Sequence, residues 1–274
     1  MIAILLCTYN GEKYLCEQLD SLLNQSYKDY NIYIHDDGSI DNTNNILKSY
    51  QFKHSEKIHI LEDNIKGRGA KNSFMWLLSK VNAEYYMFCD QDDIWLKNKV
   101  EDSFIRIKDL EYQHPQKPIT VYTDLSLIDK NGNIIFPSFW KYSNFKIKFS
   151  NKFNFLSLKN VVTGCTMIFN NRAKQISFPI NENIQMHDYS IALMTAKYGI
   201  LDYIPKQTIL YRQHENNVVG CGIQNDYNNI IPKSSFIDFI KQYKQNKKFY
   251  DSIDYGPFIK VLWYKIILFI ISRI

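Results

Sequence analysis

The sequence predicts an α/β fold built on a doubly wound sheet flanked by helices, and two observations support this. Short apolar runs typical of buried strands alternate with amphipathic helical segments through the first third of the chain. Acidic and other polar residues directly follow several of those runs, which is where open α/β sheets place their ligands. A chain of 274 residues, 45% of them hydrophobic, is long enough to bury a substantial core, as one large domain or two small ones.

The first half of the chain alternates strands and helices. We expect strands at the apolar runs Ile2–Cys7, Tyr30–His35, Lys57–Leu61 and Glu84–Cys89. We expect helices between them, at Glu12–Leu23, around Thr43–Tyr50 and at Lys71–Lys80. Strand–helix–strand units of this length imply parallel crossovers.

The second half is less regular. We expect strands at Ile119–Asp124 and Val162–Phe169, and a helix at His187–Tyr198. The carboxyl-terminal part of the chain looks helical and basic. We therefore predict one main domain over residues 1–220 and a basic, apolar tail over residues 221–274.

The cysteines and the amino terminus indicate a reducing, cytoplasmic setting. The five cysteines are odd in number and no two form a Cys-x-x-Cys pair, which argues against a disulfide framework or a zinc knuckle. Met1–Cys7 is too short for a signal peptide and lacks a basic leader, so we expect the first strand to begin almost at the initiator.

The net charge of +5 is unevenly distributed. No acidic residue occurs from Lys130 to Asn181, where lysines are interleaved with Phe, Tyr and Trp. This pattern fits nucleic acid, anionic lipid headgroups, or an ordinary solvated basic surface. Phe258–Ile271 is apolar except for Lys260 and Lys265, and it is shorter than the roughly 20 residues that span a bilayer. It suits an interfacial segment, or one that packs on the protein or on a second copy.

A pair of carboxylates stands at the end of the fourth expected strand. Asp90 and Asp92 follow the apolar run that ends at Cys89. Two carboxylates separated by one residue can hold a hard divalent cation, which in turn can bridge the oxygens of a diphosphate. A solvated acidic turn has the same letters, so the motif needs support from other segments.

The ends of the first two strands supply that support. Thr8, Asn10 and Gly11 can offer a hydroxyl, an amide and a close backbone to a nucleotide, although Asn10 or Gly11 could simply belong to a helix cap. Asp36 and Asp37 end the second strand, and one of them can accept a hydrogen bond from a base imide or a ribose hydroxyl.

Together these segments resemble the family-2 glycosyltransferases with the GT-A fold, a large inverting family that builds bacterial surface polysaccharides. The resemblance spans residues 1–220 through ordered motifs: Thr8-Tyr9-Asn10-Gly11, Asp36-Asp37-Gly38-Ser39-x-Asp41-x-Thr43, Asn64-x-x-Gly67, Asp90-Gln91-Asp92-Asp93-x-Trp95, Thr163-Gly164-Cys165, His187-Asp188 and Tyr211-Arg212-Gln213-His214-x-x-Asn217. Two of them are most similar to the rhamnosyltransferase-type subgroup of O-antigen and capsule enzymes, whose members also transfer other sugars. The resemblance implies a mixed, mainly parallel sheet and a helical carboxyl-terminal tail.

The resemblance also implies roles for individual residues. Asp188 would be the general base, because an inverting transfer needs a carboxylate to deprotonate the acceptor hydroxyl. At the start of a helix it could instead be an acid favoured by the helix dipole. Asp92 and His214 would hold a divalent cation, Mn²⁺ or Mg²⁺. The donor would contact Thr8, Tyr9, Asn10, Asp36, Asp37, Lys66, Asp90, Gln91, Trp95 and Arg212. The acceptor would contact Gly164, Cys165 and His187. Trp95 could equally fill the core, and Gly164 could serve a sheet bulge.

By the same resemblance, the donor would be a UDP- or dTDP-sugar carrying rhamnose, galactose, glucose or an N-acetylhexosamine. The acceptor would be a lipid-linked glycan, so we expect a cytoplasmic protein that is peripheral on the inner face of the cell membrane. It would contact an anionic membrane surface and no nucleic acid, and a homodimer is left open.

Other classes fit less well. A nucleotide-sugar pyrophosphorylase would open with a Gly-rich basic phosphate loop, which Thr8–Gly11 is not. A dinucleotide-binding oxidoreductase needs Gly-x-Gly-x-x-Gly after the first strand, and that motif is absent. A non-catalytic polysaccharide- or lipid-binding protein would have no need of Asp90, Asp92 and Asp188.

Overall fold

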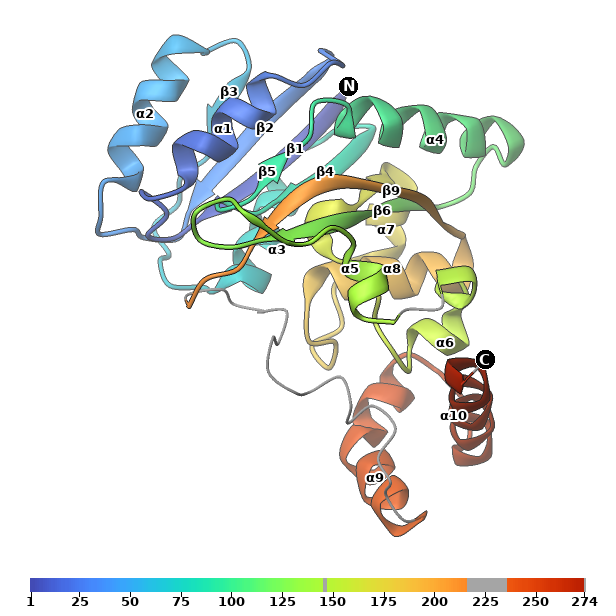
Figure 1. Ribbon diagram of the computed structural model, residues 1–274. Helices are drawn as coiled ribbons and strands as arrows, with labels where there is room; N and C mark the ends of the chain where they lie inside the picture. The colour runs from blue at the N-terminus through green and yellow to red at the C-terminus, as the bar shows by residue number, and fades with distance from the viewer. Residues whose placement is uncertain (145–146, 216–235, 274) are drawn as a thin grey trace.

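The structure, a computed structural model, describes residues 1–144, 147–215 and 236–273 (Figure 1). Within these residues, nine strands form one sheet. They are β1 (Ile2–Thr8), β2 (Tyr30–Asp36), β3 (Ile58–Ile60), β4 (Tyr85–Cys89), β5 (Ile94–Trp95), β6 (Ile119–Ile128), β7 (Ile134–Phe136), β8 (Ile168–Asn170) and β9 (Ile200–Arg212). The helices are α1 (Leu15–Leu23), α2 (Thr43–Lys53), α3 (Ala70–Lys80), α4 (Lys99–Gln113), α5 (Phe139–Tyr142), α6 (Phe153–Leu156), α7 (Asn171–Ser177), α8 (His187–Tyr198), α9 (Phe236–Ser252) and α10 (Phe258–Arg273), with 3-10 turns η1 (Ile147–Phe149) and η2 (Gly164–Thr166).

The sheet is mixed, as predicted. Its order is β3-β2-β1-β4-β8-β6-β9-β5, with β7 paired to β6. The first four strands in this order are parallel, β8 is antiparallel to both β4 and β6, and β9 is parallel to β6. The right-handed twist that all strands share lets such a sheet curl, and Figure 1 shows β9 arching over the sheet.

Helices cover both faces of the sheet. Figure 1 shows α1, α2 and α4 on one face and α3, α7 and α8 on the other. Every residue of β4 and all but one residue of β1 are buried, as expected for central strands packed on two sides. The predicted strands of the first half and the predicted helix at His187–Tyr198 are confirmed.

Several elements differ from the sequence prediction or were missed by it. The run Val162–Phe169 is not one strand, because residues 164–166 form η2 and the strand β8 begins only at Ile168. The Thr166 hydroxyl donates to the Thr163 carbonyl at 2.6 Å, a local bond that competes with strand pairing. The prediction also omitted α4, α5, α6, α7, β5, β7 and β9.

The carboxyl-terminal helices form a tail attached to the body. The Tyr255 hydroxyl donates to the Asn154 carbonyl at 3.0 Å, and Asn181 Nδ2 donates to the Ser252 carbonyl at 2.9 Å. No helix in the part of the chain that the structure describes is long and apolar enough to cross a membrane. The predicted domain boundary at residue 220 lies outside the described residues and stays a prediction.

Candidate active site

The carboxyl ends of β1, β2 and β4 meet at one edge of the sheet, because these strands are parallel and in register. Thr8 of β1 pairs with Asp36 of β2, and Leu6 pairs with Cys89 of β4. The Thr8 hydroxyl donates to Asp36 Oδ1 at 2.8 Å. The strand ends that the sequence analysis singled out therefore lie next to one another.

Asp36 and Asp37 hold the loops of this edge. Asp36 Oδ2 accepts the backbone N–H groups of Gly38 and Ser39 at 3.1 and 2.8 Å. Asp37 accepts two backbone N–H groups from the loop before α3, those of Arg68 at 2.9 Å and Gly69 at 2.8 Å. Each carboxylate thus shapes the predicted nucleoside pocket through its loop.

Lys66 lies on that second loop and is exposed. Gly38 has a φ of 94°, and a Cβ built on it would lie 2.8 Å from the Lys66 Cβ. Only glycine combines that backbone conformation with such a close approach. Gly38 therefore lets Lys66 approach the end of β2.

Tyr9 and Gln91 join the end of β1 to the acidic loop. The Tyr9 N–H donates to Gln91 Oε1 at 2.9 Å, and Gln91 Nε2 donates to the Tyr9 carbonyl at 3.0 Å. A Cβ on Gly11 would lie 2.3 Å from the same Gln91 oxygen, so glycine leaves room for this pair. The Asn10 side chain accepts the Ile40 N–H at 2.9 Å, and both Tyr9, 55% exposed, and Asn10 remain accessible in this turn.

Asp92 and His214 converge from distant parts of the chain. Asp92 lies between β4 and β5, and His214 follows β9, whose last residues pair with β5. The two side chains are each 14% exposed, and His214 Nε2 lies 2.7 Å from Asp92 Oδ2. A carboxylate and an imidazole that already face one another suit a divalent cation such as Mn²⁺. The predicted pair of metal ligands is therefore chemically and spatially consistent.

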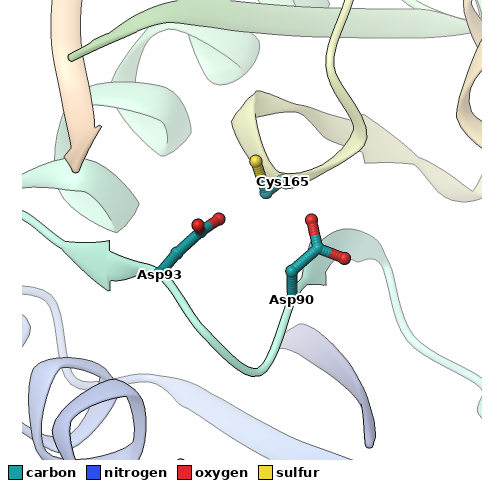
Figure 2. Close-up of side chains that lie close together, drawn as sticks. All are labelled: Asp90, Asp93 and Cys165. Atoms are coloured by element: carbon teal, nitrogen blue, oxygen red, sulfur yellow. The ribbon is translucent and has the colours of Figure 1, made fainter. Parts of the chain in front are cut away.

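Asp90, Asp93 and Cys165 form a cluster beside this pair (Figure 2). Their potential ligand atoms all lie within 4.8 Å of one another, and Figure 2 shows both carboxylates pointing toward the turn that carries Cys165. Lys99, fully buried on α4, lies close enough to interact electrostatically with Asp93 and Cys165. Burial lowers the pKa of Lys99 to about 8, against these opposing influences. Burial, and then the charges of Asp92 and Asp90, raise the pKa of Asp93 well above its usual value. We interpret this buried cluster as a support for the loop.

The pKa values of Asp90 and Asp188, like that of Asp93, are raised at the edge of the sheet. Burial, and then the charges of Asp92 and Asp188, raise the pKa of Asp90 to about 7. Burial also raises the pKa of Asp188 to about 6, opposed by backbone hydrogen bonds from Tyr189 and Gly164. Asp188 and the acidic loop are thus close neighbours, and acids with such shifts mark sites of proton transfer.

Gly164 makes room for Asp188. A Cβ added at Gly164 would lie 3.0 Å from Asp188 Oδ2 and 3.1 Å from the Asp188 Cβ. Asp188 belongs to the first turn of α8, and its Oδ1 accepts the Tyr189 N–H at 2.6 Å. Gly164 was predicted to contact the acceptor; in the structure it contacts Asp188.

Several predicted contact residues are buried. Cys165, which was predicted to contact the acceptor, is 1% exposed and belongs to the cluster in Figure 2. For three others, the structure does not support a direct role. Trp95 is 2% exposed and belongs to the hydrophobic core, so it does not line a donor pocket. His187 is 4% exposed, with its ring 4.5 Å from that of Phe74 and 4.6 Å from that of Phe88. Burial lowers the pKa of His187 to about 3, so it is neutral and does not face an acceptor.

Arg212 is the third of these residues. It is 2% exposed, and its guanidinium pairs with Glu17 on α1 at 2.5 Å. Its partners Glu17 and Tyr14 were not found by sequence reasoning, because a charged and an aromatic residue at the start of an ordinary amphipathic helix carry no distinguishing signal. Sequence reasoning assigned no role to Asp93 and Lys99 for a similar reason, because their burial depends on the tertiary structure.

Comparisons with known proteins show what this chain is similar to in sequence and in fold. A family model described as glycosyl transferase family 2 matches residues 3–176. The chain is similar to a dTDP-rhamnosyl transferase, RfbG, of Shigella flexneri, with 32% identity over 80% of this chain and 74% of that protein. Its fold is similar to that of TarS of S. aureus in complex with UDP-GlcNAc, with a TM-score of 0.59, 16% identity, and coverage of 84% of this chain and 64% of that chain.

A second solved structure is a mannosyltransferase, PcManGT, of Pyrobaculum calidifontis in complex with GDP-Man and Mn²⁺. The TM-score is 0.57 and the identity 12%, and the match covers 79% of this chain and 58% of that chain. The chain therefore spans less than two thirds of either solved structure, and the likeness to both concerns the fold.

Proposed function

The chain belongs to glycosyl transferase family 2, and we propose that it transfers a hexose-type sugar, with inversion, from a nucleoside diphosphate donor to a hydroxyl group of a lipid-linked glycan. The observation that carries this proposal is the position of Asp188 at the edge of the sheet. Its carboxylate lies beside the acidic loop after β4, with a pKa raised to about 6. A base of that pKa is mostly deprotonated at pH 7 and still accepts a proton.

The proposed reaction is a single displacement. The acceptor oxygen attacks the anomeric carbon while Asp188 takes the hydroxyl proton. The new carbon–oxygen bond forms as the bond from that carbon to the diphosphate oxygen breaks, and the departing nucleoside diphosphate keeps the electron pair. One carboxylate suffices for this chemistry, because no covalent sugar–enzyme intermediate forms.

The residues of the acidic loop serve the leaving group. We propose that Asp92 and His214 hold Mn²⁺ or Mg²⁺, which neutralises the diphosphate when bound. Asp90 would contact the ribose, as its place after β4 allows. The side chains at the ends of β1 and β2, with Lys66 and with Gln91 after β4, would surround the nucleoside. Those at the ends of β1 and β2 are Thr8, Tyr9, Asn10, Asp36 and Asp37.

The donor is proposed to be a UDP- or dTDP-sugar. The printed names support this choice, because a relative is a dTDP-rhamnosyl transferase and a structural neighbour binds UDP-GlcNAc. The Mn²⁺ of the mannosyltransferase complex supports the choice of cation.

The acceptor is proposed to be a growing surface-polysaccharide glycan on a lipid at the inner face of the cell membrane. The tail supports this location. Large apolar side chains on α10 are exposed at spacings of four, three and four residues, which places them along one helical face: Ile259, Trp263, Ile266 and Ile270. Lys260 lies next to them, and such a helix suits the boundary between headgroups and acyl chains.

The central test removes the base and keeps its shape. In Asp188→Asn, donor hydrolysis, with water in place of the acceptor, should fall by about two to four orders of magnitude. Binding of UDP or dTDP with Mn²⁺, measured by calorimetry, should persist. Asp109→Asn, a surface carboxylate on α4 that pairs with Arg106, is the matched control. Hydrolysis at the wild-type rate in Asp188→Asn would show that the base lies elsewhere.

A further inference from the structure

We infer that Arg212 is a positioning residue for both metal ligands, Asp92 and His214, and makes no contact with the donor diphosphate. The inference rests on the proposed function, because it concerns the cation that the proposed reaction uses. It differs from the sequence-based expectation, which placed Arg212 on the donor.

Arg212 holds the loop that carries Asp92. Its side-chain Nε donates to the Asp92 carbonyl at 2.9 Å, and its backbone N–H donates to Asp93 Oδ1 at 3.2 Å. Two successive residues of the loop are therefore tied to the last residue of β9. The first bond fixes the carbonyl of the Asp92–Asp93 peptide and the second holds the Asp93 side chain, so both restrain the loop from which the Asp92 carboxylate projects.

Arg212 also reaches the second ligand, through Tyr14. The guanidinium carbon lies 4.5 Å from the centre of the Tyr14 ring. The same ring stacks on the His214 imidazole, with centroids 5.2 Å apart and an interplanar angle of 28°. His214 is also only two residues beyond Arg212 in the chain. The Arg212 guanidinium thus holds the backbone of Asp92 and packs on the Tyr14 ring that stacks on His214.

The charge of Arg212 is already matched inside the protein. Nη2 pairs with Glu17 Oε2 at 2.5 Å, and Nη1 donates to the Lys130 carbonyl at 3.4 Å. The Arg212 side chain is 2% exposed, while that of Glu17 is 53% exposed. A buried guanidinium that lost these partners would be strongly destabilising, so the arrangement favours a cation that stays with Glu17 when a diphosphate binds.

Each of the three side-chain nitrogens of Arg212 has its own acceptor: the Asp92 carbonyl, the Lys130 carbonyl and the Glu17 carboxylate. This arrangement allows a discriminating test of the inference. Lysine carries one point charge and cannot reproduce a planar fork, yet it is a good phosphate ligand. Arg212→Lys should therefore fail as a positioning residue and succeed as a phosphate contact.

The experiment measures the Mn²⁺ concentration that gives half-maximal binding of UDP and of dTDP, by calorimetry on the full chain. In Arg212→Lys this concentration should rise about 10- to 100-fold, the usual cost of losing a partner that orients a metal ligand. Saturating Mn²⁺ should restore the nucleotide affinity. Glu17→Gln, which keeps the shape of a half-exposed side chain and an oxygen that can still accept from Arg212, should shift the Mn²⁺ requirement in the same direction by a smaller factor.

Arg106→Lys is the matched control, because the Arg106 guanidinium is likewise held by more than one acceptor, the carboxylates of Asp109 and Asp202, but lies partly exposed on α4. Its Mn²⁺ requirement should equal that of the wild type. The inference is overturned if Arg212→Lys or Glu17→Gln binds Mn²⁺ like the wild type, or if nucleotide affinity stays low at saturating Mn²⁺. A wild-type protein that binds neither nucleotide with Mn²⁺ would instead contradict the proposed function itself.

Discussion

Replacing Gly164 by alanine should slow catalysis without weakening nucleotide binding. The new Cβ would lie 3.0 Å from Asp188 Oδ2, where ordinary van der Waals contact begins at 3.4 Å. Asp188 is the group that must give way, because the other close atoms at this point are its own Cβ and Cγ. The substitution therefore acts on the proposed base alone.

The size of the effect follows from that overlap. Relieving it requires a shift of about 0.4 Å, and a misplacement of about 1 Å costs about 100-fold in rate, so we expect a loss of about sixfold in kcat. Gly164→Ser, with one more atom at the same place, should lose more. The assay is hydrolysis of a UDP- or dTDP-sugar at saturating Mn²⁺, with nucleotide affinity and thermal unfolding measured beside it.

Thr166→Ser is the control from the same turn, since it keeps a hydroxyl to donate to the Thr163 carbonyl and adds no atom beside Asp188. It should hydrolyse the donor like the wild type. If Gly164→Ala is folded and equally fast, then either the position of the Asp188 carboxylate does not limit the reaction or Asp188 is not the base.

Three further predictions concern protonation, the core and the tail. The hydrolysis rate should fall about tenfold per pH unit below about 6, the pKa to which burial raises Asp188. Because this pKa is above that of an unfolded Asp, the contribution of Asp188 to stability is complete below about pH 4 and lost as the pH rises through about 6. A hydrolysis rate that is flat from pH 5 to 8 would contradict the assignment of Asp188 as the base. His187→Phe should keep the rate of hydrolysis and the thermal stability within a few degrees, because the ring is buried between Phe74 and Phe88; a selective loss of activity would restore His187 to the site. Replacing the four exposed apolar residues of α10 by serine should weaken flotation with anionic vesicles, which replacement of the exposed Phe52 and Tyr112 on the body should leave unchanged; equal binding by both variants would place the membrane contact elsewhere.

The sequence predicts best those elements whose burial leaves a simple pattern. β1 and β4 are buried on both faces and read as continuous apolar runs. The sequence does not predict β9, because Pro205 and Lys206 lie in a β-bulge that interrupts its pattern. Thr123 of β6 pairs with Ile204, and the next residue, Asp124, pairs with Gln207. The sequence does not predict α4, because the polar residues Lys99 and Ser103 are buried on its inner face and obscure the apolar pattern of that face.

The same limit applies to the site. The motifs locate the edge of the sheet where Asp90, Asp92 and Asp188 gather, because strand ends and spacing are local properties. They do not distinguish a side chain that faces a ligand from one that supports it. Trp95 and His187 belong to the same motifs as the acidic residues, yet each is packed in the core, and only the tertiary structure separates the two kinds.

The carboxyl-terminal tail packs on α8, the helix whose second residue is the proposed base, Asp188. Near the amino end of α8 the Tyr189 ring stacks on Phe249 at 5.9 Å, and near its other end Lys197 Nζ donates to the Ile253 carbonyl at 2.8 Å. A helix of this length is about 18 Å long, so the tail is braced at two well-separated points. In the proposed membrane contact of α10, this bracing by α8 would fix the distance of Asp188 from the lipid. Only glycans whose terminal hydroxyl reaches that distance would then be extended.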